Sequence, residues 1–440
     1  QSLRTIQQCA VDNAQSETLA KIIKEAFYVD DFVYGADTVE ECKELITQVT
    51  HTMAQGQFPL TKFMSNDPEV LREIPEEKKI TSYAKDNVEK FKTLGLNYDP
   101  IRDEFSLNIQ APEKVIYTKR GVSSVVAKNY DPLNFILPYT MLLRIFLQQI
   151  WATKVDWDEE LDETWKGKFD AVIQNMHKLA DIKITRWLNT SSNGFLDLIG
   201  FSDASGLAKA AVIYARVQTN DIFNTHLVIA KGGVNKLKNA AVIASAQETI
   251  PKLELQALLI LAELYQQIKN CFTHLNVQFR AYVDSKIIIY WMRSKTVNKN
   301  KYVQRRVEKI RKILDPYSIH YINTKLNPAD IPSRSRMIDE LLDENLWWEG
   351  PDFLKNSELP STSDDDLNSS IPSTYITQNE EKEADMFAKF SSFNRLLRSV
   401  AYMRRWMQYK RTTDGVHTEF SANEVTMARK SIIKYYQHRE

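Results

Sequence analysis

Between Leu196 and Arg334 the sequence alternates strand-like and helix-like segments in an order that few folds can accommodate. Three β-rich runs come first, and their short separations predict an antiparallel meander. A long apolar helix, a strand, two shorter helices, a last strand and a final helix follow. Strands joined through helices add to a sheet by crossover connections, so the later strands should extend the meander. The segment therefore predicts an α/β domain built on a mixed five-stranded sheet.

Four acidic residues occur in this segment where the expected strands and helices would meet one end of the sheet. They are Asp203 in GFSDASG, Glu254 in IPKLELQAL, Asp284 in AYVDSK and Asp330 in NPADIPSR. A carboxylate cluster without a matching Lys or Arg is costly unless cations neutralise it, and hard oxygen ligands suit Mg²⁺ or Mn²⁺. Two such ions can hydrolyse a phosphodiester, because one activates water and the other stabilises the leaving oxygen. The alternative for each acid is a solvated residue or a helix cap, as Asp330 after Asn-Pro could be.

Length and composition place the chain among ordinary globular proteins. With 440 residues, 43% of them hydrophobic and 26% charged, it should form two or three domains. Lys plus Arg (57) equal Asp plus Glu (57), so nucleic acid would have to bind through local basic patches. The three scattered cysteines exclude a disulfide framework and a zinc knuckle and fit a reducing compartment. No signal peptide opens the chain, which predicts a cytoplasmic or nuclear protein without a membrane partner.

Helical patterns precede the α/β segment. The apolar stretch 134–151 is too short and too polar to span a membrane and predicts a buried helix. Large aromatic side chains in this region are expected to anchor the core, and these are Trp151, Trp157, Trp165 and Trp187.

Residues 346–385 should connect the α/β segment to the end of the chain. Most of that stretch is rich in Ser, Thr, Pro and acidic residues and cannot bury enough apolar surface to order itself. It therefore predicts a linker. Beyond it, residues 386–440 predict basic amphipathic helices, one of them with Ser421 as its N-cap.

Basic residues gather with interleaved aromatic residues in two stretches, VQRRVEKIRK and LLRSVAYMRRWMQYKR. Such stretches can bind nucleic acid, and the ordinary alternative is an amphipathic helix with solvated Lys and Arg side chains. The candidate binding residues in the first stretch are Arg305, Arg306, Arg311 and Lys312.

The tetrapeptide YVDD stands between two short β-rich runs near the start of the chain. Adjacent acids at such a position can be simple turn formers. An aromatic residue, Val and two Asp at a hairpin turn also resemble the metal-binding motif of a reverse-transcriptase palm. The residues concerned are Tyr28, Asp30 and Asp31.

Longer strings carry a wider resemblance. FSDAS followed by AVIYAR, IPKLELQALLILAEL, YVDSKIIIYW, RRVEKIRKI, NPADIPSR and LWWEGP resemble the polyprotein of BEL/Pao-type long-terminal-repeat retrotransposons, between reverse transcriptase and integrase. FPLTKFMSN, KTLGLNYDP and YDPLNFILP fit the same family. The resemblance implies a ribonuclease H-like domain that uses two Mg²⁺ or Mn²⁺ ions to cut the RNA strand of an RNA–DNA hybrid. Its implied catalytic and metal-binding residues are Asp203, Glu254, Asp284 and Asp330.

The same resemblance divides the chain into parts. It implies a reverse-transcriptase palm remnant, a helical thumb or connection, the ribonuclease H-like domain, a linker and a basic helical segment before the integrase. The expected boundaries are 1–112, 113–195, 196–345, 346–385 and 386–440.

Departures from the family pattern limit what we expect of this chain. An earlier palm Asp and the polymerase fingers are missing before Tyr28, so the chain should not polymerise without an upstream piece. The paired His and Cys of an integrase zinc module are also missing, so strand transfer is not expected. Upstream polymerase and downstream integrase segments are therefore expected partners. The loop RSKTVNKNK lacks the His that assists product release in many ribonucleases H, and His320 lies on a predicted strand.

Two further functions are alternatives to cleavage of a hybrid. The chain could be an inactive nucleic-acid-binding or scaffold remnant of a retroelement, which its basic stretches would support. An aspartic peptidase needs Asp-Thr/Ser-Gly, whereas DASG at Asp203 has an intervening residue inside a strand that the nuclease explains better. We therefore do not expect proteolysis.

Overall fold

The protein is described here from a computed structural model, which combines helices with sheets. The chain divides into two compact units, Gln1–Ser370 and Ile371–Glu440, which are described separately. The residues that the structure describes are 2–80, 91–93, 95–190, 194–236, 249–272, 275–296, 298, 300–364, 392–409 and 420–437.

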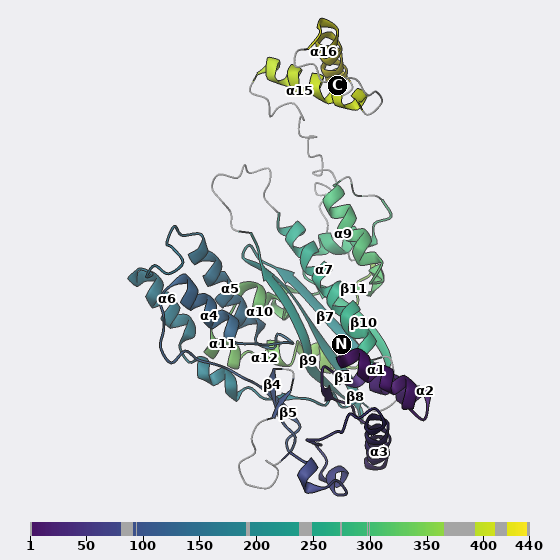
Figure 1. The fold of residues 1–440 in the computed structure, drawn as a ribbon. Helices are drawn as coiled ribbons and strands as arrows, with labels where there is room; N and C mark the ends of the chain where they lie inside the picture. The colour runs from purple at the N-terminus through teal and green to yellow at the C-terminus, as the bar shows by residue number, and fades with distance from the viewer. Residues whose placement is uncertain are drawn as a thin grey trace. The chain divides into compact units, whose positions relative to one another are not determined.

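A mixed five-stranded sheet forms the centre of the first unit, in the order β11-β10-β7-β8-β9 (Figure 1). β7, β8 and β9 pair antiparallel, while β10 lies parallel to both β7 and β11. This arrangement confirms the expected meander, its parallel extension and the α/β class. The strands are β7 (Phe195–Ala204), β8 (Ala208–Thr219), β9 (Ile222–Val234), β10 (Asn276–Val283) and β11 (Ile319–Tyr321).

Side-chain alternation along β7 divides the sheet into two buried faces. Leu196 and Leu198 belong to a core with the helices that follow the meander. Ile199 and Phe201 point to the other face and belong to a second core, which includes the helical region before the sheet. The helices of the first face are α7 (Ile250–Ile268), α8 (Lys286–Arg293) and α9 (Lys301–Arg311).

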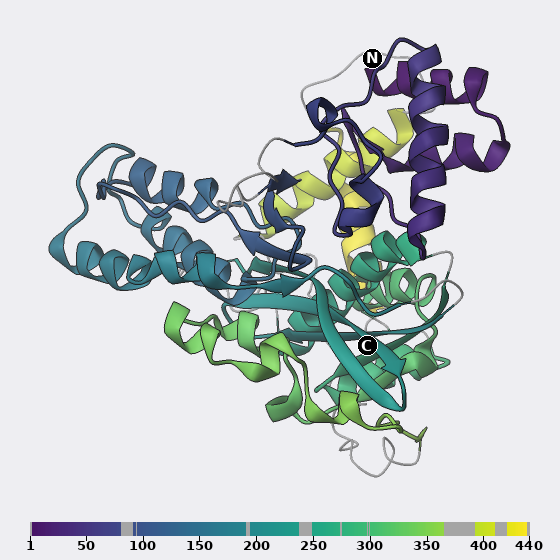
Figure 2. The same cartoon turned by 90° about the horizontal axis from the view of Figure 1, so that it is seen from below.

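The second face is covered by segments from both sides of the sheet in sequence. α5 (Leu137–Trp151) packs on β9 and on α10 (Asp330–Arg334), and α10 in turn packs on β7 and β8. Figure 2 shows the light green stretch that includes α10 along one side of the teal strands. The other helices of this region are α4 (Lys119–Lys128), α6 (Glu163–Ile173), α11 (Ile338–Leu342) and α12 (Asn345–Trp348).

The buried helix predicted from residues 134–151 is confirmed as α5, whose start carries a Pro and is therefore favoured as a helix beginning. In the described part of the chain, no helix has both the length and the apolar character needed to cross a membrane. The prediction of tryptophan anchors was wrong for Trp151, Trp157 and Trp187, which are 56%, 38% and 51% exposed. Trp151 lies in the last turn of α5 and packs edge-on against Trp157 at the surface, and smaller aliphatic residues fill the core instead.

A small antiparallel sheet, β3-β4-β5-β6, joins the two ends of the helical region, because β6 pairs with β5 across a long stretch of sequence. Its strands are β3 (Phe91–Thr93), β4 (Leu96–Asp99), β5 (Glu104–Leu107) and β6 (Ile184–Thr185). Tyr98 donates a hydrogen bond to Asp103, which also forms an ion pair with Arg186 just after β6.

The first residues form a helical subdomain with its own core around Ile23 and Met53. Ser16 and Thr38 accept hydrogen bonds from backbone amides and so cap its second and third helices. The elements are α1 (Ser2–Asn13), α2 (Glu17–Ala26), β1 (Phe27–Tyr28), β2 (Asp31–Phe32) and α3 (Val39–Gln55).

The beginning of the expected linker 346–385 lies on the sheet. Arg216 on β8 donates to the carbonyl of Leu354 at 2.7 Å, and Tyr282 on β10 donates to that of Pro360 at 2.9 Å. These backbone carbonyls accept the hydrogen bonds of buried polar side chains. The composition of the segment does not reveal such contacts. The part of the linker from residue 365 onward is outside the described residues.

The second unit contains the helices α15 (Phe393–Tyr409) and α16 (Ala422–Gln437), as the basic helical pattern predicted. Arg405 and Glu424 join them by an ion pair of 2.7 Å. The amide of Glu424 donates to the Oγ atom of Ser421 at 3.3 Å, so the predicted N-cap is confirmed.

Candidate functional site

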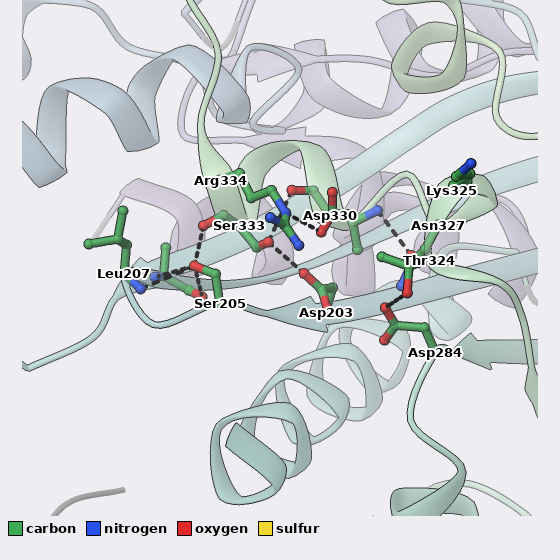
Figure 3. Close-up of polar contacts among 12 residues, drawn as sticks. Asp203, Ser205, Leu207, Asp284, Thr324, Lys325, Asn327, Asp330, Ser333 and Arg334 are labelled. Atoms are coloured by element: carbon green, nitrogen blue, oxygen red, sulfur yellow. Dashed lines mark hydrogen bonds and ion pairs between the residues drawn. The ribbon is translucent and has the colours of Figure 1, made fainter. Parts of the chain in front are cut away.

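Two of the four candidate acids lie on neighbouring parallel strands. Asp203 is the second-last residue of β7, and Asp284 directly follows β10. The register pairs Val283 with Ser202, which brings Asp284 beside Asp203 at the same end of the sheet. Figure 3 shows both side chains there, together with Asp330.

The other two acids come from helices. Asp330 is the first residue of α10, which packs on β7 and β8. Glu254 lies near the start of α7 on the opposite face of the sheet and accepts a hydrogen bond from the side chain of Ser285, next to Asp284. The sequence thus places one acid on each of four separate elements.

Burial and mutual repulsion both act on these carboxyl groups. Burial, together with the charges of Asp284 and Asp330, raises the pKa of Asp203 to about 6 against the lowering effect of a hydrogen bond from Ser333. Burial likewise raises the pKa of Glu254 to about 7, with added repulsion from Asp284 and Asp203. The pKa of Asp284 is raised by burial and by the charge of Asp330. Each of the four acids is therefore within electrostatic reach of at least two of the others.

Three of the acids have partners in the protein. Asp203 accepts a hydrogen bond from Ser333 at 2.5 Å, and Asp284 accepts one from Thr324 at 2.8 Å. Asp330 forms an ion pair of 2.6 Å with Arg334. Figure 3 shows these three contacts as dashed lines.

The donor atoms of this cluster fit a hard divalent cation, since all are carboxylate oxygens in a buried region of raised pKa. As the side chains stand, no group of three His, Cys, Asp or Glu residues within the described ranges is arranged to hold a metal ion. The hydroxyl groups of Ser333 and Thr324 and the guanidinium of Arg334 contact carboxylate oxygens of the cluster, so a cation would compete with them for these oxygens.

Arg334 corrects the assumption that the acids lack a matching cation. The charges of Asp330, Asp203 and Asp284 all raise the pKa of its guanidinium, after the hydrogen bond with Asp330 as the largest cause. Its spacing of four residues from Asp330 on one helix is a pattern from which the pair could have been predicted. Ser333, Thr324 and Ser285, which donate hydrogen bonds to the acids, were also missed and have no comparable signal in the sequence.

The basic residues of α9 differ in their surroundings. Arg305 and Lys312 are exposed. Arg306 stacks on the ring of Tyr302 at 3.4 Å. Arg311 donates to three carbonyls around the end of α8, including that of Ser294 at 2.5 Å, and so caps that helix.

The YVDD segment forms the two-residue turn of the hairpin β1–β2, in which Tyr28 pairs with Asp31. Asp30 and Asp31 are exposed, and Tyr28 is 61% exposed. Val29 has a φ of 59°, which is rare for a β-branched residue and shows a strained turn.

His320 lies on β11, as the sequence predicted, and is buried. Its Nδ1 atom accepts a hydrogen bond from the amide of Thr362. Burial lowers the pKa of its ring to about 4, with a smaller contribution from the charges of Arg280 and Arg293. The His320 ring is therefore neutral at physiological pH and forms part of the buried structure.

Comparisons with solved structures find ribonucleases H and a foamy viral protease-reverse transcriptase. The chain is similar to RNase H1 from the archaeon Halobacterium salinarum NRC-1, at 14% identity over 34% of this chain and 99% of that chain, with a TM-score of 0.21. The N-terminal RNase H domain of Rv2228c from Mycobacterium tuberculosis has 12% identity, covers 32% of this chain and 94% of its own, and has a TM-score of 0.22. A foamy viral protease-reverse transcriptase in complex with double-stranded DNA has 13% identity over 72% of this chain and 49% of its own, with a TM-score of 0.41.

No curated protein matches the sequence. Residues 118–285 match a family model described as a Pao retrotransposon-like RNaseH-like domain. This match includes the helical region before the sheet as well as β7 to β10 and three of the four acids, Asp203, Glu254 and Asp284. Residues 118–285 of this chain thus form a Pao retrotransposon-like RNaseH-like domain.

Proposed function

We propose that this RNaseH-like domain is a two-metal nuclease that cuts the RNA strand of RNA–DNA hybrids. The observation that carries the proposal is the gathering of four acids from four elements, three of them with pKa values raised by burial and by one another. Asp203, Glu254, Asp284 and Asp330 would hold two Mg²⁺ or Mn²⁺ ions. Bound ions supply an activated water and a stabilised leaving oxygen.

The chain's own residues would orient the ligands and the substrate. Hydrogen bonds from Ser333 and Thr324 hold the carboxylates of Asp203 and Asp284. Exposed Arg305 on α9 and Lys312 directly after it would bind phosphates of the duplex through charge. Contacts to 2′-hydroxyl groups across the minor groove would distinguish RNA from DNA.

The remaining parts keep the assignments implied by the family resemblance. We propose that residues 1–112 are the last part of a reverse-transcriptase palm, with Tyr28, Asp30 and Asp31 at its metal-binding hairpin. Residues 113–195 would be the connection, 196–345 the ribonuclease H-like domain and 386–440 a basic helical segment. Upstream polymerase and downstream integrase segments would be partners.

A hybrid-cleavage assay tests the proposal. With Mg²⁺ or Mn²⁺, the protein should cut an end-labelled RNA strand paired with DNA and leave the DNA strand intact. EDTA should stop the reaction, and duplex DNA and duplex RNA are the matched substrates. Equal cutting of all three duplexes, or none with either metal, would contradict the proposal.

Binding without cleavage is a second candidate function. It is favoured by the exposed basic residues Arg305 and Lys312, which can bind phosphates without any chemistry. In that case the protein would bind a labelled hybrid in a gel mobility-shift assay with the same affinity in Mg²⁺ and in EDTA, and the RNA strand would stay intact. Loss of binding in Arg305→Ala would then locate the interface on α9.

Replacing Arg334 by Ala should increase the affinity for divalent ions. Arg334 is an internal counter-charge for Asp330, and that ion pair must loosen when a metal binds. An exposed pair of this kind is worth about 0.5–1 kcal/mol, so the dissociation constant for Mn²⁺ should fall about two- to fivefold. Calorimetric titration with Mn²⁺ measures the change.

Arg336→Ala is the matched control, since Arg336 lies just beyond α10 and pairs with Glu344 instead. An unchanged or weaker affinity in Arg334→Ala would show that Arg334 does not compete with the metal.

A further inference from the structure

A line of hydrogen bonds connects α5 to the carboxylate of Asp203. The side chain of Gln148 donates to the carbonyl of Asn235 at 2.7 Å, and the Asn235 side chain donates to the carbonyl of Ser205 at 2.8 Å. The hydroxyl of Ser205 donates to the carbonyl of Ser333 at 2.6 Å. The hydroxyl of Ser333 then donates to the Oδ2 atom of Asp203 at 2.5 Å. Figure 3 shows the part of this line from Ser205 to Asp203.

The line is shielded from water over much of its length, with Gln148 and Ser205 half-buried. Asn235, Ser333 and Asp203 are buried, at 5%, 0% and 6% exposure. Water competes weakly for buried hydrogen bonds, so each bond restricts the position of the next residue.

The turn after β7 is held from several sides. The amides of Leu207 and Ala208 donate to the hydroxyl of Ser205, at 3.1 and 3.2 Å. The amide of Asn235 donates to the carbonyl of Leu207 at 2.7 Å. Displacing Asn235 would therefore move the backbone that immediately follows Asp203.

A second connection joins α5 to the other side of the site. The amide of Arg336, just after α10, donates to the carbonyl of Pro138 in α5 at 3.2 Å, and the two helices pack together. α5 thus touches both segments that approach Asp203, the turn after β7 and the end of α10.

We propose that α5 is a positioning element of the site and that Gln148 and Asn235 act on the Asp203 carboxylate through Ser205 and Ser333. The helical region before the sheet would then be part of the working nuclease rather than a separate spacer. The effect of α5 on turnover rests on the proposed function, whereas the effect of α5 on the backbone around Asp203 is independent of that function.

The test compares Gln148→Ala with Gln149→Ala in the full chain. Gln149 is the next residue of α5 and is exposed, so its replacement removes the same side chain without breaking the line. Gln148→Ala should speed amide hydrogen exchange in residues 203–208 and 330–335 of the metal-free protein, and Gln149→Ala should not. For hybrid cleavage, kcat should fall about tenfold in Gln148→Ala with KM unchanged, because losing partners behind a metal ligand costs about 10–100-fold.

Ser333→Ala provides the second comparison. If both side chains act along one line, the double variant Gln148→Ala/Ser333→Ala should lose less than the product of the two single effects. Unchanged hydrogen exchange near Asp203 in Gln148→Ala would overturn the proposal. Full additivity of the two variants in kcat would also overturn it. If the parent protein cuts no hybrid, the proposed function fails, and the exchange experiment alone decides the role of α5.

Discussion

Asp203→Asn is expected to remove metal-dependent cleavage while making the metal-free protein more stable. Losing a direct ligand should lower kcat/KM by more than about 100-fold, the upper end of the cost of losing a residue behind a ligand. Asn keeps the shape of the side chain but carries no charge. It therefore relieves the repulsion from Asp284 and Asp330 that helps to raise the pKa of Asp203. Cleavage should fall while the free energy of unfolding rises, so a loss of activity in this variant cannot be explained by unfolding.

The matched control is Asp197→Asn on the same strand and the same face. Asp197 forms a buried ion pair of 2.6 Å with Arg216, so its neutral variant should lose stability and keep cleavage. Cleavage is measured on the labelled hybrid, and the free energy of unfolding in urea with EDTA present. Equal cleavage by Asp203→Asn and the parent would remove Asp203 from the proposed metal site.

Much of the central domain could be predicted because its signals are local. The alternation along β7 and the apolar length of α7 define a strand and a buried helix without tertiary information. Crossover rules then place the ends of β7 and β10 together, and with them Asp203 and Asp284. The acid positions follow from the order of the elements.

Contacts between distant parts of the sequence could not be predicted in this way. Nothing near Gln148 in the sequence indicates that its side chain reaches the backbone of Asn235, 87 residues away. The carbonyl of Leu354 satisfies Arg216 across 138 residues, so a stretch that was expected to begin a linker covers the sheet instead. Such partners are selected by the folded geometry, whereas composition reports only the average tendency of a segment to be buried.

The unfolding free energies of Glu254→Gln and of the parent, compared over a range of pH, should reveal the cost of keeping the Glu254 carboxylate in the acidic cluster. Burial, with repulsion from Asp284 and Asp203, raises the pKa of Glu254 from an ordinary value of 4.5 to about 7. Below pH 4.5 the carboxyl is protonated in the folded and unfolded chain alike, so parent and variant differ little in this respect. Between pH 4.5 and about pH 7 the Glu254 carboxyl is ionised in the unfolded chain but still protonated in the folded chain. The parent therefore becomes less stable as pH rises through this range.

The parent should thus lose up to about 3 kcal/mol of unfolding free energy relative to Glu254→Gln between pH 4.5 and pH 7.5, at about 1.4 kcal/mol per pKa unit. Urea unfolding in EDTA at several pH values measures this difference. His320, whose pKa burial lowers to about 4, titrates in the opposite sense but is present in both proteins and cancels. Saturating Mg²⁺ should flatten the difference, because a bound cation stabilises the ionised carboxylates. A difference that does not change with pH would mean that Glu254 is solvated and stands outside the cluster, which would leave three acids for the two ions.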